Sequence, residues 1–115
     1  MHEYSIVASL IDRVGREMAA HRASRVNRLH VQIGELSGVE IELLKTAFET
    51  FRERSVCGEA ELCIDPVPAV WACPRCGREM PRGSVLRCSD CGVPARLTRG
   101  DEIILARIEM ETADV

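Results

Sequence analysis

The pattern of hydrophobic and polar residues along this chain predicts two helices. Over residues 6–18, hydrophobic residues recur three or four positions apart, which is typical of one face of a helix of about 16 residues. Ser37 and Glu40 fit a capping box, so we expect a second helix to begin there. Its hydrophobic stripe includes both phenylalanines of the chain and is expected to supply the bulkiest part of the core. The stripe consists of Val39, Leu43, Leu44, Ala47, Phe48 and Phe51.

Alternation of hydrophobic and polar residues predicts strands elsewhere. Residues 28–33 alternate strictly, with Leu29, Val31 and Ile33 on the face expected to be buried, which indicates a half-buried strand that Gly34 ends. Residues 60–64 alternate in the same way. We expect Pro66 and Pro68 to close this second strand, because proline has no N–H to donate to a β-ladder.

A third strand is predicted over residues 102–110, after a cysteine-rich insert. The order helix, strand, helix, strand, insert, strand predicts an α+β fold, in which a small three-stranded sheet carries two helices on one face. Ile108 is expected to face the helices. Ile103 and Leu105 then point away from them, toward either a dimer or partner surface or the insert.

Two CxxC pairs carry the strongest chemical signal in the sequence. CPRCG at 73–77 and CSDCG at 88–92 are separated by eleven residues between Cys76 and Cys88. Each CxxC turn can place two sulfur atoms on one ion, and the glycine that follows permits the positive φ that closes the turn. We expect a structural Zn(II) site, with rubredoxin-like iron and a redox dithiol pair as the alternatives. The expected ligands are Cys73, Cys76, Cys88 and Cys91.

The insert and the remainder of the chain differ in charge. Residues 72–99 hold six arginines and two acidic residues, so this segment carries a formal charge of +4 and the rest of the chain −7. A Zn(II) ion with four thiolates carries −2 and lowers the segment to about +2. The insert also lacks an aromatic side chain that could stack on bases. We therefore expect its arginines to be solvated or to contact an acidic protein, rather than to bind nucleic acid.

Composition narrows the remaining classes. The chain has 115 residues, of which 46% are hydrophobic and 29% charged, and no hydrophobic run approaches the roughly 20 residues of a membrane span. No signal peptide is visible, so a cytoplasmic location with reduced cysteines is expected. Of the two remaining cysteines, Cys57 is expected to fill space near a loop and Cys63 to be accessible. No nucleophile, base and oxyanion donors can be assembled, so we do not expect an enzyme.

Several segments together resemble the hydrogenase nickel-incorporation proteins of the HypA/HybF family. They are MHEYSI at the start, IGELSGVE, LLKTAFE and AELCIDPVPAVWACPRCG with the second CxxC. The resemblance implies a metallochaperone that binds Ni(II) transiently at its amino terminus and keeps a structural Zn(II) in a ribbon. It also implies delivery to the precursor of the [NiFe]-hydrogenase large subunit, with a HypB-family GTPase as partner, and in some bacteria urease maturation proteins. His2 matches the nickel ligand, Met1 and Glu3 its backbone neighbours, and the four CxxC cysteines the zinc ligands.

The chemistry of the first three residues suits nickel independently. The α-amine of Met1, the backbone nitrogen and imidazole of His2, and the backbone nitrogen of Glu3 can form a planar donor set. Planar nitrogen donors suit Ni(II) or Cu(II) and suit tetrahedral Zn(II) poorly. Retention of Met1 is expected because histidine is a large second residue, and mild acid is expected to release the metal because protons compete for the imidazole.

These expectations define two domains and one alternative function. Residues 1–68 and 99–115 are expected to form a discontinuous, nickel-binding α+β domain, and residues 69–98 an inserted zinc-ribbon domain with four cysteine ligands. The sequence leaves open whether the protein is a monomer or a homodimer. The alternative function is that of a zinc-ribbon adaptor that binds protein or nucleic acid and handles no nickel.

Overall fold

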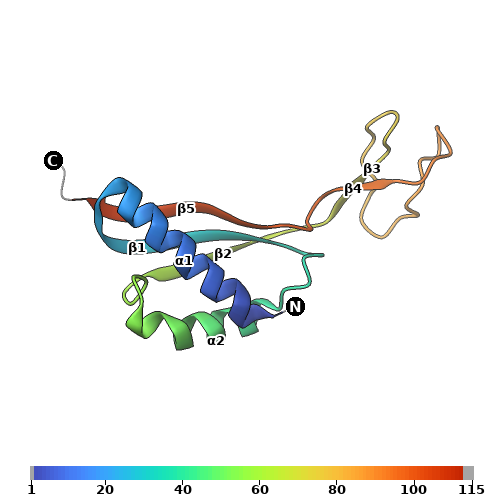
Figure 1. Ribbon diagram of the computed structural model, residues 1–115. Coiled ribbons are helices and arrows are strands. Elements are labelled where there is room, and N and C mark those ends of the chain that lie inside the picture. Colours follow the sequence, from blue (N-terminus) through green and yellow to red (C-terminus); the bar gives the residue numbers. More distant parts are fainter. Residues whose placement is uncertain (1, 113–115) are drawn as a thin grey trace.

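The chain forms two sheets at opposite ends of an elongated molecule (Figure 1). The computed structural model describes residues 2–112. A three-stranded sheet has the order β2-β1-β5, and a two-stranded sheet pairs β3 with β4. The elements are α1 (Glu3–His21), β1 (Ala23–Gly34), α2 (Ile41–Phe51), a 3₁₀ turn (Arg52–Arg54), β2 (Glu61–Val67), β3 (Val70–Ala72), β4 (Arg96–Arg99) and β5 (Ile103–Thr112). This arrangement confirms the predicted α+β fold with an insert.

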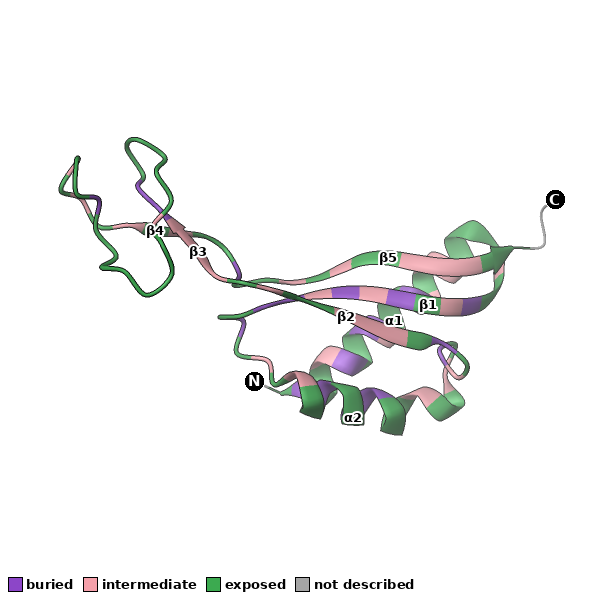
Figure 2. Cartoon of the chain, turned by 180° about the vertical axis from the view of Figure 1, so that it is seen from behind, coloured by how far each residue is buried: buried purple, intermediate pink, exposed green. Residues whose placement is uncertain are grey.

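The central strand β1 organises the larger sheet. It runs parallel to β2, to which α2 connects it, and antiparallel to β5. Both helices pack on one face of this sheet, and most of the buried residues, purple in Figure 2, lie on β1 and on the helices that cover it. One core cluster results, made of Val7, Leu10, Val14, Val26, Leu29, Val31, Ile33, Leu44, Ala47, Phe48, Cys57 and Ala60. We call this part of the molecule, residues 2–68 and 100–112, the body.

A β-bulge in β5 overturns the prediction for two of its residues. From the pair His30–Arg107 to the pair Val31–Leu105, β1 advances by one residue and β5 by two. Ala106 is therefore left without an opposite residue on β1. An additional residue exchanges the two faces of a strand, because side chains alternate. Ile103 and Leu105 therefore pack against the same core as Ile108, and the expectation that they point away from the helices is wrong.

Three element boundaries also differ from the prediction. α1 begins at Glu3, before the hydrophobic periodicity starts, and β1 extends back to Ala23. Pro66 lies within β2 rather than ending it. β2 is an edge strand, and an edge strand tolerates proline because its outward N–H needs no partner.

The second helix buries fewer residues than its stripe suggested. Leu44, Ala47 and Phe48 are buried, whereas Leu43 is 40% and Phe51 45% exposed. The Phe51 ring instead packs edge-on against Tyr4 of α1, with 5.3 Å between the ring centroids. Among the described residues, no helix combines the length and apolar character needed to cross a bilayer.

The connections to the smaller sheet pass through a narrow neck. Gly34 at the end of β1 lies so close to Gly100 that a Cβ on Gly34 would come within 2.4 Å of the Gly100 backbone. A Cβ on Gly100 would lie 2.5 Å from the Ala69 Cα, and Gly100 has a φ of +101°. Three chain segments thus cross at backbone contact distance, which only glycine permits at two of these positions.

Candidate metal centre

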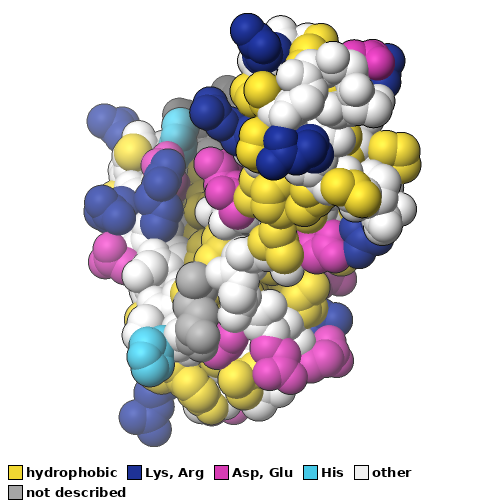
Figure 3. All heavy atoms as spheres, turned by 90° about the vertical axis from the view of Figure 1, so that its right-hand side faces the viewer, with side chains coloured by type: hydrophobic (Ala, Val, Ile, Leu, Met, Phe, Trp, Pro, Cys, Tyr) yellow, Lys and Arg dark blue, Asp and Glu magenta, His cyan; other side chains and the backbone are white. Residues whose placement is uncertain are grey.

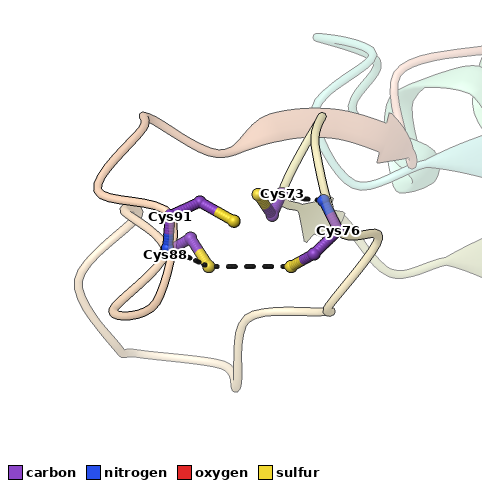
Figure 4. A group of neighbouring side chains, drawn as sticks. All are labelled: Cys73, Cys76, Cys88 and Cys91. Carbon is purple, nitrogen blue, oxygen red and sulfur yellow. Dashed lines mark hydrogen bonds between the residues drawn. The ribbon is translucent and has the colours of Figure 1, made fainter.

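Four cysteines converge at the end of the molecule distant from the body (Figure 4). The sulfur atoms of Cys73, Cys76, Cys88 and Cys91 all lie within 4.8 Å of one another. The Cys76 and Cys88 sulfurs are 3.7 Å apart. A tetrahedral ion with Zn–S bonds of about 2.3 Å has sulfurs about 3.8 Å apart, so the donor set and its spacing both fit Zn(II).

The two CxxC turns repeat one hydrogen-bonding pattern. In the first, the Cys73 N–H donates to the Arg78 carbonyl and the Gly77 N–H to the Cys73 carbonyl. In the second, the Cys88 N–H donates to the Val93 carbonyl and the Gly92 N–H donates to the Cys88 carbonyl. Both glycines have positive φ, +79° and +68°, which confirms the sequence prediction for these turns. The repeat presents two pairs of sulfurs to a common centre.

Backbone N–H groups donate to the sulfur of the first cysteine in each turn, and in the first turn they favour the thiolate. The Cys73 sulfur accepts bonds from the N–H groups of Cys76 and Arg75, at 3.5 and 3.4 Å. These bonds lower the pKa of Cys73 to about 6, the Cys76 N–H being the largest cause. The Cys88 sulfur accepts from the Cys91 N–H at 3.4 Å. The neighbouring Cys73 sulfur raises the pKa of Cys91 to about 12. Four thiolates this close together repel one another, so all four are deprotonated together only around a cation.

The ribbon, which we define as residues 69–99, has almost no core of its own. Its only buried residues are Ala72, Cys73 and Cys88. Val85 and Leu86, between the two turns, are exposed. A segment with so little apolar burial needs another source of stability, and a four-thiolate metal site supplies one.

The amino-terminal segment lies beside the start of α2, where the loop that follows β1 ends. His2 is exposed and occupies the N-cap position of α1. Its carbonyl accepts the first helical hydrogen bond, from the Ile6 N–H at 3.2 Å, so the N–H groups of His2 and Glu3 precede the helical ladder. Met1, the third residue of the predicted nickel site, lies outside the described residues.

Glu3 has a structural partner that the sequence did not suggest. Its side chain is buried, and Oε2 accepts a hydrogen bond from the Glu40 N–H at 3.0 Å. This bond, together with the Glu3 N–H, lowers the pKa of the Glu3 carboxyl. Glu40 is the N-cap of α2, so a carboxylate from α1 satisfies the start of α2.

The predicted capping box is therefore wrong. α2 has no side-chain cap of its own, and Ser37 Oγ instead accepts a bond from the Val39 N–H at 3.3 Å within the preceding turn. A capping box needs the serine directly before the helix, and here Glu40 occupies that position. The contact that replaces it joins residues 37 positions apart, which no local pattern reveals.

Two ribbon arginines already have acidic partners. Arg78 pairs with Asp90 inside the ribbon, with 2.6 Å between Nη2 and Oδ2. Arg82 pairs with Glu35 of the body through both guanidinium nitrogens. Their partners reduce the basic surface that a nucleic acid would meet.

The remaining cysteines and histidines are not gathered into a metal site among the described residues. Cys57 is fully buried in the body core, as expected for a space-filling residue. Cys63 is partly exposed on the polar face of β2, where its Sγ lies 3.7 Å from a Glu61 oxygen. His30 lies on the outer face of the sheet and contacts Glu109.

Known proteins match this chain over nearly its whole length. Residues 1–110 match the model of a family described as "Hydrogenase/urease nickel incorporation, metallochaperone, hypA". The hydrogenase maturation factor HypA of Shewanella halifaxensis is 43% identical over 116 residues, which cover 98% of this chain and 100% of that protein. Its counterpart in Wolinella succinogenes is 41% identical over 117 residues, covering 99% of this chain and 98% of that protein.

Solved structures agree with the sequence matches. The solution structure of the Ni metallochaperone HypA from Helicobacter pylori aligns with a TM-score of 0.74 and 34% identity, covering 97% of this chain and 99% of that chain. A metallochaperone carries metal and performs no chemical conversion, which agrees with the prediction that this protein is not an enzyme. The fold, the four-cysteine cluster and these matches together show that the chain belongs to the HypA family of hydrogenase and urease nickel-incorporation metallochaperones.

Proposed function

We propose that this protein binds Ni(II) through Met1, His2 and Glu3 and releases it for [NiFe]-hydrogenase maturation. The observation that carries the proposal is the position of His2, exposed at the N-cap of α1 with its backbone nitrogen ahead of the helical ladder. The imidazole and the first two amide nitrogens after the terminus are therefore free of helical hydrogen bonds. Planar nitrogen coordination of this kind suits Ni(II).

In this proposal Glu3 contributes its backbone nitrogen and not its carboxylate. The carboxylate is buried and occupied by the Glu40 N–H. Its contact fixes the first turn of α1 against α2, which leaves His2 outside. A site at an exposed helix start also suits transfer, because the ion can leave without unfolding the core.

The four ribbon cysteines are proposed to hold a structural Zn(II). Cys73, Cys76, Cys88 and Cys91 fill a tetrahedral shell and leave no position for water or for cargo. Zinc there supplies charge balance for the thiolates and joins the two turns. We further propose two domains, since the two sheets share no strand. The boundaries expected from the sequence, 1–68 with 99–115 and 69–98, divide β4, so we place the second boundary after Arg99, where β4 ends.

The proposed protein partners follow from membership of the family. They are a HypB-family GTPase that handles nickel, the precursor of the [NiFe]-hydrogenase large subunit and, where urease is present, urease maturation proteins. The proposed setting is the cytoplasm, where the cysteines would stay reduced and available to a metal. The alternative of a ribbon adaptor without nickel chemistry predicts that removal of the imidazole of His2 leaves nickel binding unchanged.

Calorimetric titration of zinc-loaded protein with Ni(II) tests the proposal. Wild type should bind one ion per chain at the amino terminus. His2→Ala and a variant extended by three glycines before Met1 should each lose that ion, because one removes the imidazole and the other moves the α-amine too far from it to share a planar chelate. His21→Ala is the matched control: this exposed histidine at the far end of α1 pairs with Glu17 and is not expected to bind nickel. Equal binding by all four proteins would refute the amino-terminal site.

A further inference from the structure

The neck between body and ribbon is hydrogen-bonded on both sides of the loop that follows β1. The Glu35 N–H donates to the Val67 carbonyl at 2.8 Å, and the Leu36 N–H donates to the Gly100 carbonyl at 2.7 Å. Val67 lies on the strand that leads into the ribbon, and Gly100 follows the strand that leads out. One loop of the body therefore holds both connections to the ribbon.

The Glu35 side chain adds a second layer to this junction. Its Oε1 accepts hydrogen bonds from the Ala69 N–H at 2.8 Å and from Arg82 Nη1 at 2.9 Å, while Oε2 accepts from Arg82 Nη2. The Arg82 contact is the largest cause that lowers the pKa of Glu35, to about 2, so the carboxylate is charged at neutral pH. A two-pronged arginine–carboxylate contact restricts orientation as well as distance.

Arg82 lies at the middle of the ribbon segment that joins the two CxxC turns. It is six residues after Cys76 and six before Cys88. Among residues 2–112, the pair with Glu35 is the one ion pair that joins this segment to the body. It crosses one side of an open cleft of about 830 Å³, whose lining includes Leu36, Trp71 and Met80.

The surroundings of this cleft show why an anchor is needed. Figure 3 views the molecule from the ribbon end, where hydrophobic side chains gather between the ribbon and the body. Backbone bonds at the neck fix where the ribbon starts, but an elongated segment can still tilt about a narrow junction. A contact farther along the ribbon opposes that tilt, and Arg82 with Glu35 makes such a contact.

We propose that Glu35 and Arg82 are positioning residues that hold the ribbon at one fixed angle to the body. Each is outside both proposed metal sites and acts through the ribbon as a whole. If the proposed function is correct, on which this consequence rests, a protein partner meets the ribbon and the amino-terminal segment as one surface of constant shape.

Residual dipolar couplings of backbone amides in the zinc-loaded full chain test this proposal. In wild type, the couplings of body and ribbon should fit a single alignment. Glu35→Gln and Arg82→Gln should each reduce the couplings of the ribbon relative to the body. We expect the ratio of docked to released ribbon to fall by up to about fivefold, the range of an exposed ion pair. The double variant should match either single variant, because the second substitution finds the contact already broken.

Arg78→Gln is the matched control, since it removes a ribbon arginine whose partner Asp90 lies in the ribbon itself. Its couplings should equal those of wild type. Arg82 is 71% exposed, so its replacement leaves the core intact, and unchanged amide shifts at the four cysteines verify the ribbon fold. Wild-type couplings that need two alignments, or variants that keep the wild-type ratio, would overturn the proposal. The readout involves no nickel, so this failure and a failure of the proposed nickel site are told apart.

Discussion

The body and the ribbon are both built around a small sheet, but they bury different kinds of residue. The body packs aliphatic side chains and Phe48 between its sheet and two helices. The ribbon buries Ala72 and the side chains of Cys73 and Cys88. No residue of the core cluster lies between positions 65 and 102. With the proposed zinc in the ribbon, the contrast teaches that one chain can derive stability from hydrophobic burial at one end and from metal coordination at the other.

Removal of the ribbon metal should separate the two regions most clearly. A structural zinc supplies about 10–16 kcal/mol in small zinc-binding peptides, and the ribbon has no core to replace it. We expect a strong chelator, or Cys73→Ser, to unfold the ribbon while the body keeps its fold. The fluorescence of Trp71, the single tryptophan of the chain, should report the change from within β3.

Hydrogen exchange on the same samples provides the control for this prediction. Amides of β1 in the body should keep their protection after chelation, while those around Cys88 should lose it. Collapse of both regions together would show that the ribbon stabilises the body, and the contrast would fail.

Truncation of a core phenylalanine should instead destabilise the body. Phe48→Ala removes a fully buried ring from the body and should lower the free energy of unfolding by about 3–5 kcal/mol, because a cavity remains. Phe51→Ala, one turn farther along α2, should cost only about 1 kcal/mol, because its ring is half exposed and packs against Tyr4. Urea unfolding followed by circular dichroism measures both, and equal losses would place the core elsewhere.

A methyl group at the neck should have a smaller effect of the same sign. Gly34→Ala places a Cβ within 2.4 Å of the Gly100 backbone, and the forced shift should cost about 1–3 kcal/mol. Gly15→Ala is the matched control, because nothing lies within 4 Å of its Cβ and it occupies the interior of α1. That variant should gain about 0.4–1 kcal/mol. Thermal unfolding of the two variants gives the comparison, and a stable Gly34→Ala protein would show that the neck relaxes.

Acid should weaken the outer face of the body by the smallest amount. Hydrogen bonds from His30 and then Arg107 lower the pKa of Glu109 to about 2. A depressed folded-state pKa stabilises the fold above the unfolded-state value of about 4.3, and this stabilisation is lost as the pH falls toward 2. We expect a carbon-13 titration of the Glu109 carboxyl to show a midpoint near 2, and a higher midpoint in Arg107→Gln. An ordinary midpoint in both proteins would show that these contacts are not maintained in solution.

Local patterns predicted the features of this molecule that depend on local chemistry. Alternation along β1 identified Leu29, Val31 and Ile33 as buried, and the two CxxC turns predicted both positive-φ glycines and the convergence of four sulfurs. In each case the periodicity or spacing fixes the geometry by itself. The metal-binding end was therefore the most predictable part of the candidate site.

Features that depend on distant contacts were not predictable. The bulge at Ala106 changes the face of Ile103 only because of how β5 pairs with β1. The Glu3 carboxylate reaches Glu40, and Glu35 reaches Arg82, across 37 and 47 positions of sequence. Acidic and basic residues are common, so their pairing follows from the fold and not from any motif.

X-ray absorption at the nickel and zinc edges of one doubly loaded sample tests the central claim, that the two regions hold two different metals in two different ways. The account predicts a planar shell of nitrogen donors around nickel, absent in His2→Ala, and four sulfurs around zinc that stay unchanged in that variant. Sulfur ligands on nickel, or zinc displaced from its four cysteines by added nickel, would contradict it.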